Sequence, residues 1–515
     1  MPTYSLSAPK GKWIMVSTIL ASAMAFIDAT ALNVILPSLQ KNLNATGADL
    51  FWLLNAYLLM LASLILVGGS LGDKLGRKKI FVIGITIFIV GSATCGLAPG
   101  ITFLIAFRVI QGIGGALMIP GSLSLISSSI NEGERGKAIG TWSSITTVVT
   151  IGGPILGGAL ADAGLWRFIF FINVPIGLVA LIILWFKVDE SRDTDGDKII
   201  DIPGAVAIAL GLALLTFGFL RVPALGWANP QVSFSLAGGL LFLVVFAITE
   251  LISRRPMMPL QLFNNLTFSG ANLLTFFLYA GLGSGMLFLS LNLVQAQRYS
   301  QLQSGLTFLP FTILMITIAR HAGALADKYG PRPLLILGPG LAGSGMLILS
   351  FVKQTTGPSA YWSTFFPGIL VFGLGMSLTV APLTTAVMGS VSTQFSGTAS
   401  GINNALTRIA NVFANAIFGA LAVLFFSGAL QTEIKNVAIS VDQKQEVMAQ
   451  SVNLGNAKVP VTLDVQNKMV IERAYHTAFI HAYQKILQIS AALGYLAALM
   501  AFIFIKDKGI KTRHQ

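Results

Sequence analysis

Residues 69–79 read GSLGDKLGRKK, and residues 324–332 read ALADKYGPR. Each stretch lies between two long apolar segments and places an acid three residues before a glycine, with a basic residue one or two positions later. This pattern is typical of a tight charged turn that joins two membrane helices. Because the turn occurs twice, the sequence predicts a chain built from two similar halves, an arrangement common among secondary transporters.

The composition indicates an integral membrane protein. Of the 515 residues, 54% are hydrophobic and 10% are charged, whereas a soluble domain has about 25% charged residues. Apolar runs recur along the chain, and a bilayer core needs about 20 apolar residues per helix. The runs are continuous and show no alternation of apolar and polar positions, which indicates helices rather than the strands of a membrane barrel.

The apolar runs predict an all-α membrane protein with fourteen spans. We place them at residues 13–35, 50–71, 80–98, 102–126, 138–161, 168–187, 202–221, 232–252, 269–293, 303–325, 333–352, 361–388, 397–427 and 477–505. The first span is too long for a secretory signal and lacks a small-residue cleavage pattern, so we expect it to stay in the mature chain.

The basic residues predict the orientation of the spans. With a cytoplasmic N-terminus, nineteen Lys and Arg residues fall in the short inner segments and five fall in the short outer loops. This bias follows the positive-inside rule and predicts that both termini are cytoplasmic. The net charge of +13 is then explained by topology and by contact with anionic inner-leaflet lipid, so no nucleic-acid partner is expected.

The one long hydrophilic stretch, residues 428–476, is predicted to lie outside, between the last two spans. It carries mixed charge and few aromatic residues, and residues 431–452 have the composition of an amphipathic helix. Two interpretations stay open: a solvated cap, or a docking surface for an outer partner.

Asp28 is the clearest acid inside a predicted span. A charge near the bilayer centre is costly, so an ionisable residue that persists there usually faces a cavity or a partner and has a function. Burial disfavours the ionised form of a carboxyl group, which makes Asp28 a candidate for loading and releasing a proton. The alternative is a structural carboxylate that accepts hydrogen bonds from a neighbouring helix.

Arg108 lies a few residues inside the fourth span. Because a guanidinium does not lose its proton in proteins, it needs a carboxylate, a water-filled cavity or helix-end carbonyl groups. We expect Arg108 to hold Asp28 ionised until a proton or substrate competes; the alternative is a side chain that reaches the outer interface. Arg408 and the pair Arg320-His321 are weaker candidates, because each lies close enough to a predicted span end to anchor an interface.

The fifth span contains the run Gly152-Gly153-Pro154-Ile155-Leu156-Gly157-Gly158. Small residues let helix backbones approach closely, and Pro154 removes a backbone hydrogen bond and bends the helix. A bent, closely packed helix is a candidate gate or seal.

At these residues the sequence resembles the major facilitator superfamily. Residues 69–78 resemble its motif A, residues 108–114 its motif B, and residues 152–158 its motif C, the antiporter motif. Residues 28–37 are similar to the first-span motif of drug/proton antiporters, and residues 166–177 to the sequence that enters the sixth span in the fourteen-span branch. The chain therefore resembles a fourteen-span drug/proton antiporter.

The resemblance implies a proton-coupled exporter in the cell membrane. In such a protein two six-helix bundles, joined by two extra spans, rock around a central cavity. Residues 1–187 would form the first bundle, residues 188–268 the linker with the extra spans, residues 269–505 the second bundle including the outer loop 428–476, and residues 506–515 a cytoplasmic tail.

The resemblance also implies roles for the motif residues. Asp28 and Arg108 would belong to proton coupling. Asp73 and Arg77 would latch the inner gate in the outward-facing state, because such contacts between charges and helix ends exist in one state only. The motif positions are Gly69, Gly72, Asp73, Gly76, Arg77 and Lys78 in the first turn, Asp327, Gly330 and Arg332 in the second, and Gly152, Gly153, Pro154, Gly157 and Gly158 at the bundle interface. Pro331 replaces the usual basic residue, so the second latch is expected to be weaker or to use different contacts.

Spans one, four, ten and thirteen are expected to line the central cavity, because they correspond to the innermost helices of each half. The candidate substrate residues, with one from the second span, are Asn33, Tyr57, Gln111, Phe308, Phe311, Asn403, Asn404 and Arg408. Mixed aromatic and amide side chains suit amphipathic organic molecules; ordinary helix packing is the alternative for each residue. Only Asp28 clearly adds negative charge, so we expect monocations, neutral drugs or secreted metabolites rather than dications.

Three functions stay open: proton-driven export of drugs or other amphipathic compounds, proton-coupled export of one endogenous metabolite or lipid, and a non-transporting receptor or scaffold. No enzyme is expected. The four histidines form no metal-spaced pair except His476 and His481, five residues apart, and no P-loop, dinucleotide-binding or Gly-x-Ser-x-Gly motif occurs in a suitable setting. With neither a nucleotide site nor a cofactor, transport would draw on an ion gradient.

Overall fold

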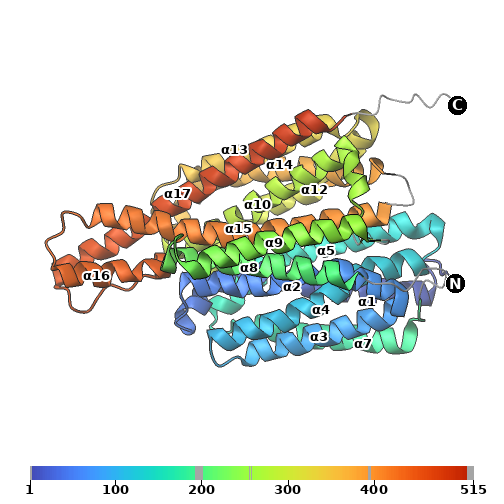
Figure 1. The fold of residues 1–515 in the computed structure, drawn as a ribbon, viewed down its shortest axis with the longest axis horizontal. Coiled ribbons are helices and arrows are strands. Elements are labelled where there is room, and N and C mark those ends of the chain that lie inside the picture. Colours follow the sequence, from blue (N-terminus) through green and yellow to red (C-terminus); the bar gives the residue numbers. More distant parts are fainter. Residues whose placement is uncertain (1–2, 192–200, 254–255, 257, 392–395, 507–515) are drawn as a thin grey trace. The chain divides into compact units, whose positions relative to one another are not determined.

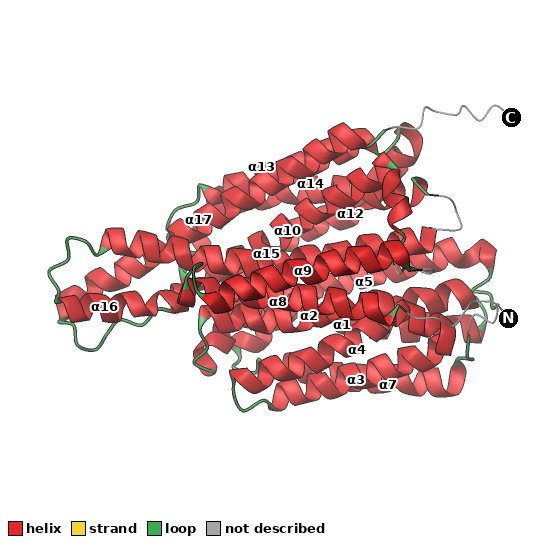
Figure 2. Ribbon diagram, viewed as in Figure 1, coloured by secondary structure: helices red, strands yellow, loops and turns green. Residues whose placement is uncertain are grey.

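The computed structural model describes residues 3–191, 201–253, 256, 258–391 and 396–506. Over these ranges the regular elements are all helices (Figure 2). One isolated bridge pairs Tyr4 with Ile130. The predicted all-α fold class is confirmed. The predicted tail 506–515 lies outside the described residues except for Lys506.

The first half of the chain forms nine helices in the described residues. They are α1 (Pro9–Asn42), α2 (Gly47–Leu75), α3 (Arg77–Leu97), α4 (Ile101–Ser129), α5 (Glu132–Asp162), α6 (Phe168–Phe171), α7 (Asn173–Lys187), α8 (Ile202–Leu225) and α9 (Pro230–Ile252). The second half contains η1 (Leu260–Asn264), α10 (Leu266–Gln295), α11 (Gln301–Leu306), α12 (Leu309–Tyr329), α13 (Arg332–Ser350), η2 (Pro358–Ala360), α14 (Tyr361–Gly389), α15 (Ser396–Glu433), α16 (Val441–Ala449), η4 (Gln450–Asn456) and α17 (Val465–Phe504).

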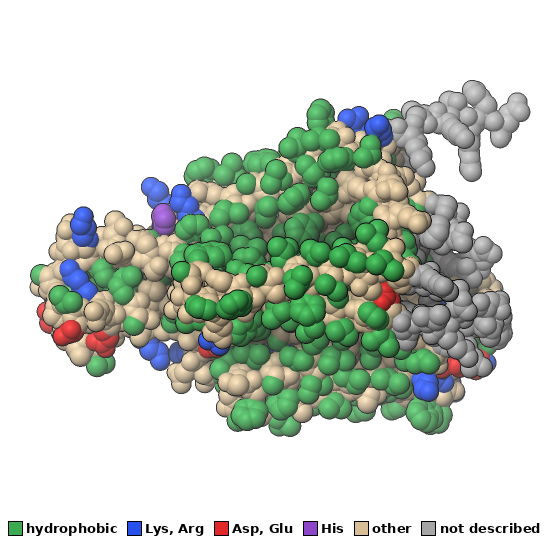
Figure 3. Space-filling model, viewed as in Figure 1, with side chains coloured by type: hydrophobic (Ala, Val, Ile, Leu, Met, Phe, Trp, Pro, Cys, Tyr) green, Lys and Arg blue, Asp and Glu red, His purple; other side chains and the backbone are tan. Residues whose placement is uncertain are grey.

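Thirteen helical segments of the described chain are long and apolar enough to cross a membrane. Large hydrophobic side chains stand on their surfaces, such as Phe186 at 74% exposure and Phe234 at 78%, and Figure 3 shows such side chains spread over the helices. Apolar surface of this extent indicates contact with lipid, so the chain is a multi-pass membrane protein. The predicted fifth span falls on α5, whose described apolar part is the shorter Val148–Asp162; the count of fourteen stays a prediction.

Packing divides the chain into two units. Unit 1 comprises Met1–Ser38, Trp52–Leu215 and Ser235–Pro259, and unit 2 comprises Leu39–Phe51, Thr216–Phe234 and Leu260–Gln515. Within unit 1, α3 packs against α4 and α7; within unit 2, α13 packs against α14 and α17, and α10 packs against α15 and α17 (Figure 1). The two units combine segments that are distant in the sequence, so they do not test the predicted domain boundaries at residues 187 and 268. Those boundaries stay predictions.

Both charged turns have the same backbone form. Gly76, between α2 and α3, has φ 116°, and Gly330, between α12 and α13, has φ 86°. L-residues rarely adopt positive φ, which explains a glycine at each position. α3 then begins at Arg77 and α13 at Arg332. The duplicated turn of the sequence is thus a duplicated backbone feature, once in each unit.

The predicted hydrophilic stretch 428–476 is mostly helical. The last turn of α15 and the first turns of α17 extend into it, and α16 lies between them. The helix predicted over residues 431–452 is wrong in its bounds: α15 continues to Glu433 and α16 begins only at Val441. Ser440 sets this start, because it forms a reciprocal capping box with Gln443.

Candidate functional site

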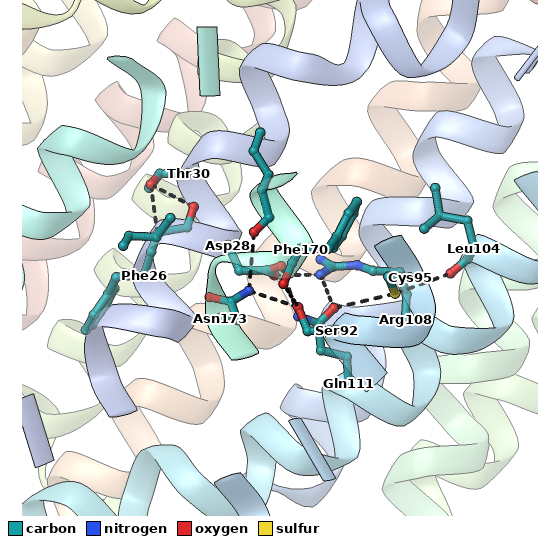
Figure 4. Close-up of polar contacts among 12 residues, drawn as sticks. Phe26, Asp28, Thr30, Ser92, Cys95, Leu104, Arg108, Gln111, Phe170 and Asn173 are labelled. Atoms are coloured by element: carbon teal, nitrogen blue, oxygen red, sulfur yellow. Dashed lines mark hydrogen bonds and ion pairs between the residues drawn. The ribbon is translucent and has the colours of Figure 1, made fainter. Parts of the chain in front are cut away.

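A buried ion pair joins α1 and α4 within unit 1. Arg108 Nη1 donates to Asp28 Oδ2 at 2.5 Å, and the two residues are 1% and 0% exposed. Gln111, one turn after Arg108, donates from Nε2 to Asp28 Oδ1 at 3.0 Å and accepts from Arg108 Nη1 at Oε1, 2.8 Å away. The three side chains therefore form a closed triangle of hydrogen bonds (Figure 4).

Side chains from α2 and α3 enclose this triangle. The ring of Tyr57 lies 4.3 Å from the guanidinium carbon of Arg108, a geometry in which the aromatic face stabilises the cation. On α3, the thiol of Cys95 lies 3.8 Å from Gln111 Oε1. Four helices of one unit thus hold the pair, and the predicted substrate residues Tyr57 and Gln111 are both part of its shell.

The two members of the pair differ in what they can do. A carboxylate taken out of water becomes neutral by binding a proton, whereas a guanidinium keeps its charge. Arg108 Nε already lacks a partner among the described residues. Protonation of Asp28 would therefore remove the counter-charge of Arg108 and leave the guanidinium buried among neutral groups, with Gln111 Oε1 at 2.8 Å. Of the two groups, only the carboxyl group can bind and release a proton.

A second polar cluster fixes the break between α6 and α7 to α3. Ser92 Oγ donates to the Phe170 carbonyl at 2.8 Å, and Asn173 Nδ2 donates to Ser92 Oγ at 2.9 Å (Figure 4). Ser92 and Asn173 are fully buried. Sequence reasoning assigned these residues no role, because a single serine or asparagine in an apolar span is no distinct signal.

Two motif C glycines mark where α5 contacts α1. A side chain at Gly153 would clash with Thr30 Oγ1, and one at Gly157 would lie 2.8 Å from the Ala31 carbonyl oxygen. Gly152, in contrast, has open space around its Cα. Thr30 and Ala31 follow Asp28 by two and three residues, so motif C packs on the part of α1 that carries the buried acid. Pro154 lies inside α5 and Gly158 is buried.

The first charged turn is held by a residue that sequence reasoning missed. Glu190 Oε1 accepts from the backbone N–H of Lys78 at 2.9 Å and Oε2 from that of Lys79 at 3.0 Å. A carboxylate is favoured there because it satisfies free N–H groups at a helix N-terminus and meets the positive end of the helix dipole. Lys78 Nζ donates to the Val188 carbonyl at 2.7 Å. A possible signal was the acid pair Asp189-Glu190, directly after the sixth predicted span.

The other motif A positions lie in α2 and at the start of α3. Gly69 and Gly72 lie in α2 with ordinary van der Waals distances around them, and Arg77 N donates to the Ser191 carbonyl at 2.7 Å. The side chain of Asp73 lies outside the described part of the structure. Beside this turn, hydrogen bonds from Lys10 and Tyr4 lower the pKa of Asp189 below its ordinary value.

The second charged turn makes different contacts. Arg332 Nη2 donates to the Phe502 carbonyl at 3.0 Å, near the end of α17, and its guanidinium carbon lies 5.7 Å from the Phe502 ring. The side chain of Asp327 is outside the described part. Its latch role therefore stays a prediction.

Several predicted substrate residues contribute to helix packing. Asn403 Nδ2 donates to Asn272 Oδ1 at 3.1 Å and to Thr275 Oγ1 at 2.7 Å, joining α15 to α10. Phe311 stacks on Phe372 with ring centroids 5.4 Å apart. Phe308 lies directly before α12. Of the others, Asn33 and Arg408 are half-buried and Asn404 is exposed.

Within unit 2, the 428–476 stretch packs on residues 39–51. Gln40 Nε2 donates to the Asn453 carbonyl at 3.0 Å, and Gln40 Oε1 accepts from Gln295 at 3.0 Å and from Asn456 at 3.1 Å. A side chain at Gly47 would lie 2.7 Å from the Val452 carbonyl oxygen. Part of the surface considered for an outer partner is therefore occupied by this chain itself.

Comparisons with known proteins agree with this architecture. The family model of the Major Facilitator Superfamily matches residues 18–415. The multidrug resistance protein Stp of Mycobacterium tuberculosis is 30% identical over 441 residues, which cover 85% of this chain and 80% of that protein. The tetracenomycin C resistance and export protein of Streptomyces glaucescens is 28% identical over 480 residues, covering 93% and 88%.

A solved structure shows the same fold. The crystal structure of a bacterial homolog to the human lysosomal transporter Spinster, in an inward-facing and unoccupied conformation, matches with a TM-score of 0.65 at 18% identity, over 96% of this chain and 98% of that one. At this identity the likeness concerns the fold alone.

Proposed function

Because this chain belongs to the Major Facilitator Superfamily, we propose that it is a proton-coupled exporter of drugs or other amphipathic small molecules. The family consists of transporters rather than enzymes, and two relatives that span most of the chain are named for drug resistance or export. We propose fourteen spans in the cell membrane with both termini in the cytoplasm. The bias of basic residues toward the predicted inner segments supports that orientation.

The observation that carries the proposal is the buried pair of Asp28 and Arg108. With Asp28 ionised, the pair is neutral and holds α1 against α4. With Asp28 protonated, the ion pair is lost while the cation stays buried, so a different helix arrangement becomes favourable. A proton that binds the two arrangements with different affinity shifts their populations, which is the physical requirement for coupling.

The glycines of motif C support the transmission of a movement of α1 to α5. Gly153 and Gly157 leave no space between α5 and the segment of α1 that follows Asp28. In closely packed helices a displacement of one forces the other to move or to separate. We infer that α1 and α5 move together when Asp28 changes its protonation state.

The charged turns fit the same cycle as state-dependent latches. We propose that Asp73 and Arg77 stabilise one conformation from the inner side, with Glu190 fixing the start of α3. The 428–476 stretch would act as a cap on the outer side. Its contacts with Gln40 favour this use over docking of an outer partner protein.

A dedicated exporter of one compound is the second candidate. One relative is named for tetracenomycin C alone, whereas another is named for multidrug resistance. A panel of structurally unrelated amphipathic compounds separates the two: transport of one chemical type alone favours the dedicated exporter.

The test is transport by purified protein in proteoliposomes with an imposed pH gradient. The panel contains a fluorescent lipophilic monocation, neutral compounds and anionic compounds, and compares wild type with Asp28→Asn. Asp442→Asn is the control, because Asp442 lies in the first turn of α16, outside the thirteen candidate spans. We expect gradient-dependent flux in wild type and the control and none in Asp28→Asn. Flux unchanged in Asp28→Asn would refute the coupling role, and no flux of any compound by folded wild type would favour a receptor or scaffold.

A further inference from the structure

Arg408 is a half-buried cation on α15 of unit 2. It forms no hydrogen bond or ion pair with any residue that the structure describes. The sequence explains why: between Leu260 and Thr432 the only acidic residue is Asp327, in the last turn of α12. This long stretch of unit 2 therefore offers few carboxylates that could neutralise the guanidinium.

Arg408 belongs to a polar face of α15. Asn404, Arg408, Asn411 and Asn415 follow one another at spacings of four, three and four residues, which places them on one side of a helix. Along this face burial increases from the exposed Asn404 through the half-buried Arg408 and Asn411 to Asn415, which is 6% exposed. The face is therefore open at Asn404 and closed at Asn415.

The register of α10 against α15 brings Tyr279 within electrostatic range of the guanidinium. Asn403 contacts Asn272 and Thr275, and Asn411 approaches Gly283 so closely that a side chain there would clash with its amide oxygen. Between these two contact points, Tyr279 lies close enough to Arg408 for an electrostatic interaction. Tyr279 is itself half-buried.

Aromatic rings lie one turn from this pair. Phe276 precedes Tyr279 by three residues and meets Phe413 of α15 edge to face, with ring centroids 6.4 Å apart. Phe276, Phe413 and Tyr279 are all half-buried. A cation and a phenol beside apolar rings suit a molecule with an acidic head and an aromatic body.

At the depth of Arg408 in its span, the guanidinium needs water or another polar partner. Arg408 follows the first residue of the candidate span Gly401–Glu433 by about two helix turns. A guanidinium at such depth is costly in lipid and normally faces water, a counter-charge or a ligand. Since the described chain provides no counter-charge, water or an anionic ligand is left.

We propose that Arg408 binds the anionic group of an aromatic amphipathic substrate, with Tyr279 donating to the same group and Phe276 and Phe413 contacting the apolar body. This inference rests on the proposed export function and names its substrate class. It also revises the expectation of monocations, because the negative charge of Asp28 is neutralised by Arg108 and buried. The one unpaired charge at this site is then positive.

Equilibrium binding to detergent-purified protein tests this inference separately from transport. The probes are 2-naphthalenesulfonate and its neutral analogue 2-naphthalenesulfonamide, which differ mainly in charge. We expect wild type to prefer the sulfonate and Arg408→Gln to weaken sulfonate binding about tenfold or more, the effect of a lost charged hydrogen bond, while sulfonamide binding changes little. Arg408→Lys should fall between them, because it keeps the charge without the planar fork of donors.

Arg221→Gln is the matched control, because Arg221 lies on α8 and is exposed; its sulfonate binding should equal that of wild type. If Arg408→Gln does not fold, Tyr279→Phe replaces it and should weaken sulfonate binding selectively. Equal wild-type affinity for both probes, or sulfonate affinity unchanged in Arg408→Gln or its replacement, would overturn the inference. Sulfonate binding without proton-driven flux of any compound would instead refute the export function and leave this binding site standing.

Discussion

The guanidinium of Arg108 meets the carboxylate of Asp28 at 2.5 Å inside unit 1, and neither residue is exposed by more than 1%. Removing one partner of such a pair typically costs about 3–5 kcal/mol, because the other charge is left buried. Removing Arg108 and removing Asp28 should have unequal costs, because a lone carboxylate can bind a proton whereas a lone guanidinium cannot release one.

Asp28→Asn should therefore lower the unfolding temperature more than Arg108→Gln. Asp28→Asn leaves the charge of Arg108 buried without a carboxylate, whereas a carboxyl group left alone can become neutral by taking up a proton. Thermal unfolding of the purified variants and of wild type measures this. Equal losses for both variants would contradict the asymmetry.

Gly153→Ala should impair transport far more than Gly152→Ala. The added methyl group would clash with Thr30 Oγ1 at Gly153 but meets nothing within 4 Å at Gly152. Both changes are chemically identical and one residue apart, so helix propensity and expression effects should largely cancel. Initial transport rates at matched protein amounts are the measurement. If the two variants lose activity equally, close packing of α5 on α1 is not what motif C provides.

Gly76→Ala should destabilise the inner end of unit 1 by about 1–3 kcal/mol, the usual cost of a strained backbone conformation. Its φ is 116°, and the new methyl group would lie 2.8 Å from the Glu190 carboxylate. Gly100→Ala is the control, because its φ is −161° and nothing lies within 4 Å. Comparable unfolding temperatures for the two variants would show that the turn tolerates a side chain.

Gly47→Val should loosen the 428–476 stretch from residues 39–51. A side chain at Gly47 would come within 2.7 Å of the Val452 carbonyl oxygen, and the nearby Lys458 is exposed to protease. We expect trypsin to cleave after Lys458 several-fold faster than in wild type, whereas Gly428→Val, with open space around it, should not change the rate. An unchanged rate in Gly47→Val would show that the cap does not depend on this contact.

The helical fold and the duplicated turns could be predicted because they follow from local sequence. Continuous apolar runs determine membrane helices, and an acid-glycine-base turn determines a positive-φ glycine, as found at Gly76 and Gly330. The pairing of Asp28 with Arg108 was also predictable, since a buried guanidinium needs a carboxylate and few were available.

The partners that lie far away in the chain could not be predicted. Glu190 reaches α3 from 112 residues away, and the Ser92–Asn173 contact spans 81 residues, with no feature in the sequence to connect them. The register of α15 against α10 likewise depends on helix packing. The sequence therefore left Arg408 open as an interface anchor or a cavity residue, and the contact of Asn411 with Gly283 and the burial of Asn415 on the same face favour the cavity.

A measurement of proton movement driven by substrate tests the proposed antiport most directly. Proteoliposomes are prepared with an acidic lumen, a pH-sensitive dye inside and the membrane potential clamped to zero, and a transported compound is added outside. Wild type should make the lumen more alkaline at a rate proportional to substrate uptake, and Asp28→Asn should not. Uptake of substrate by wild type without any change in luminal pH would contradict proton antiport through Asp28.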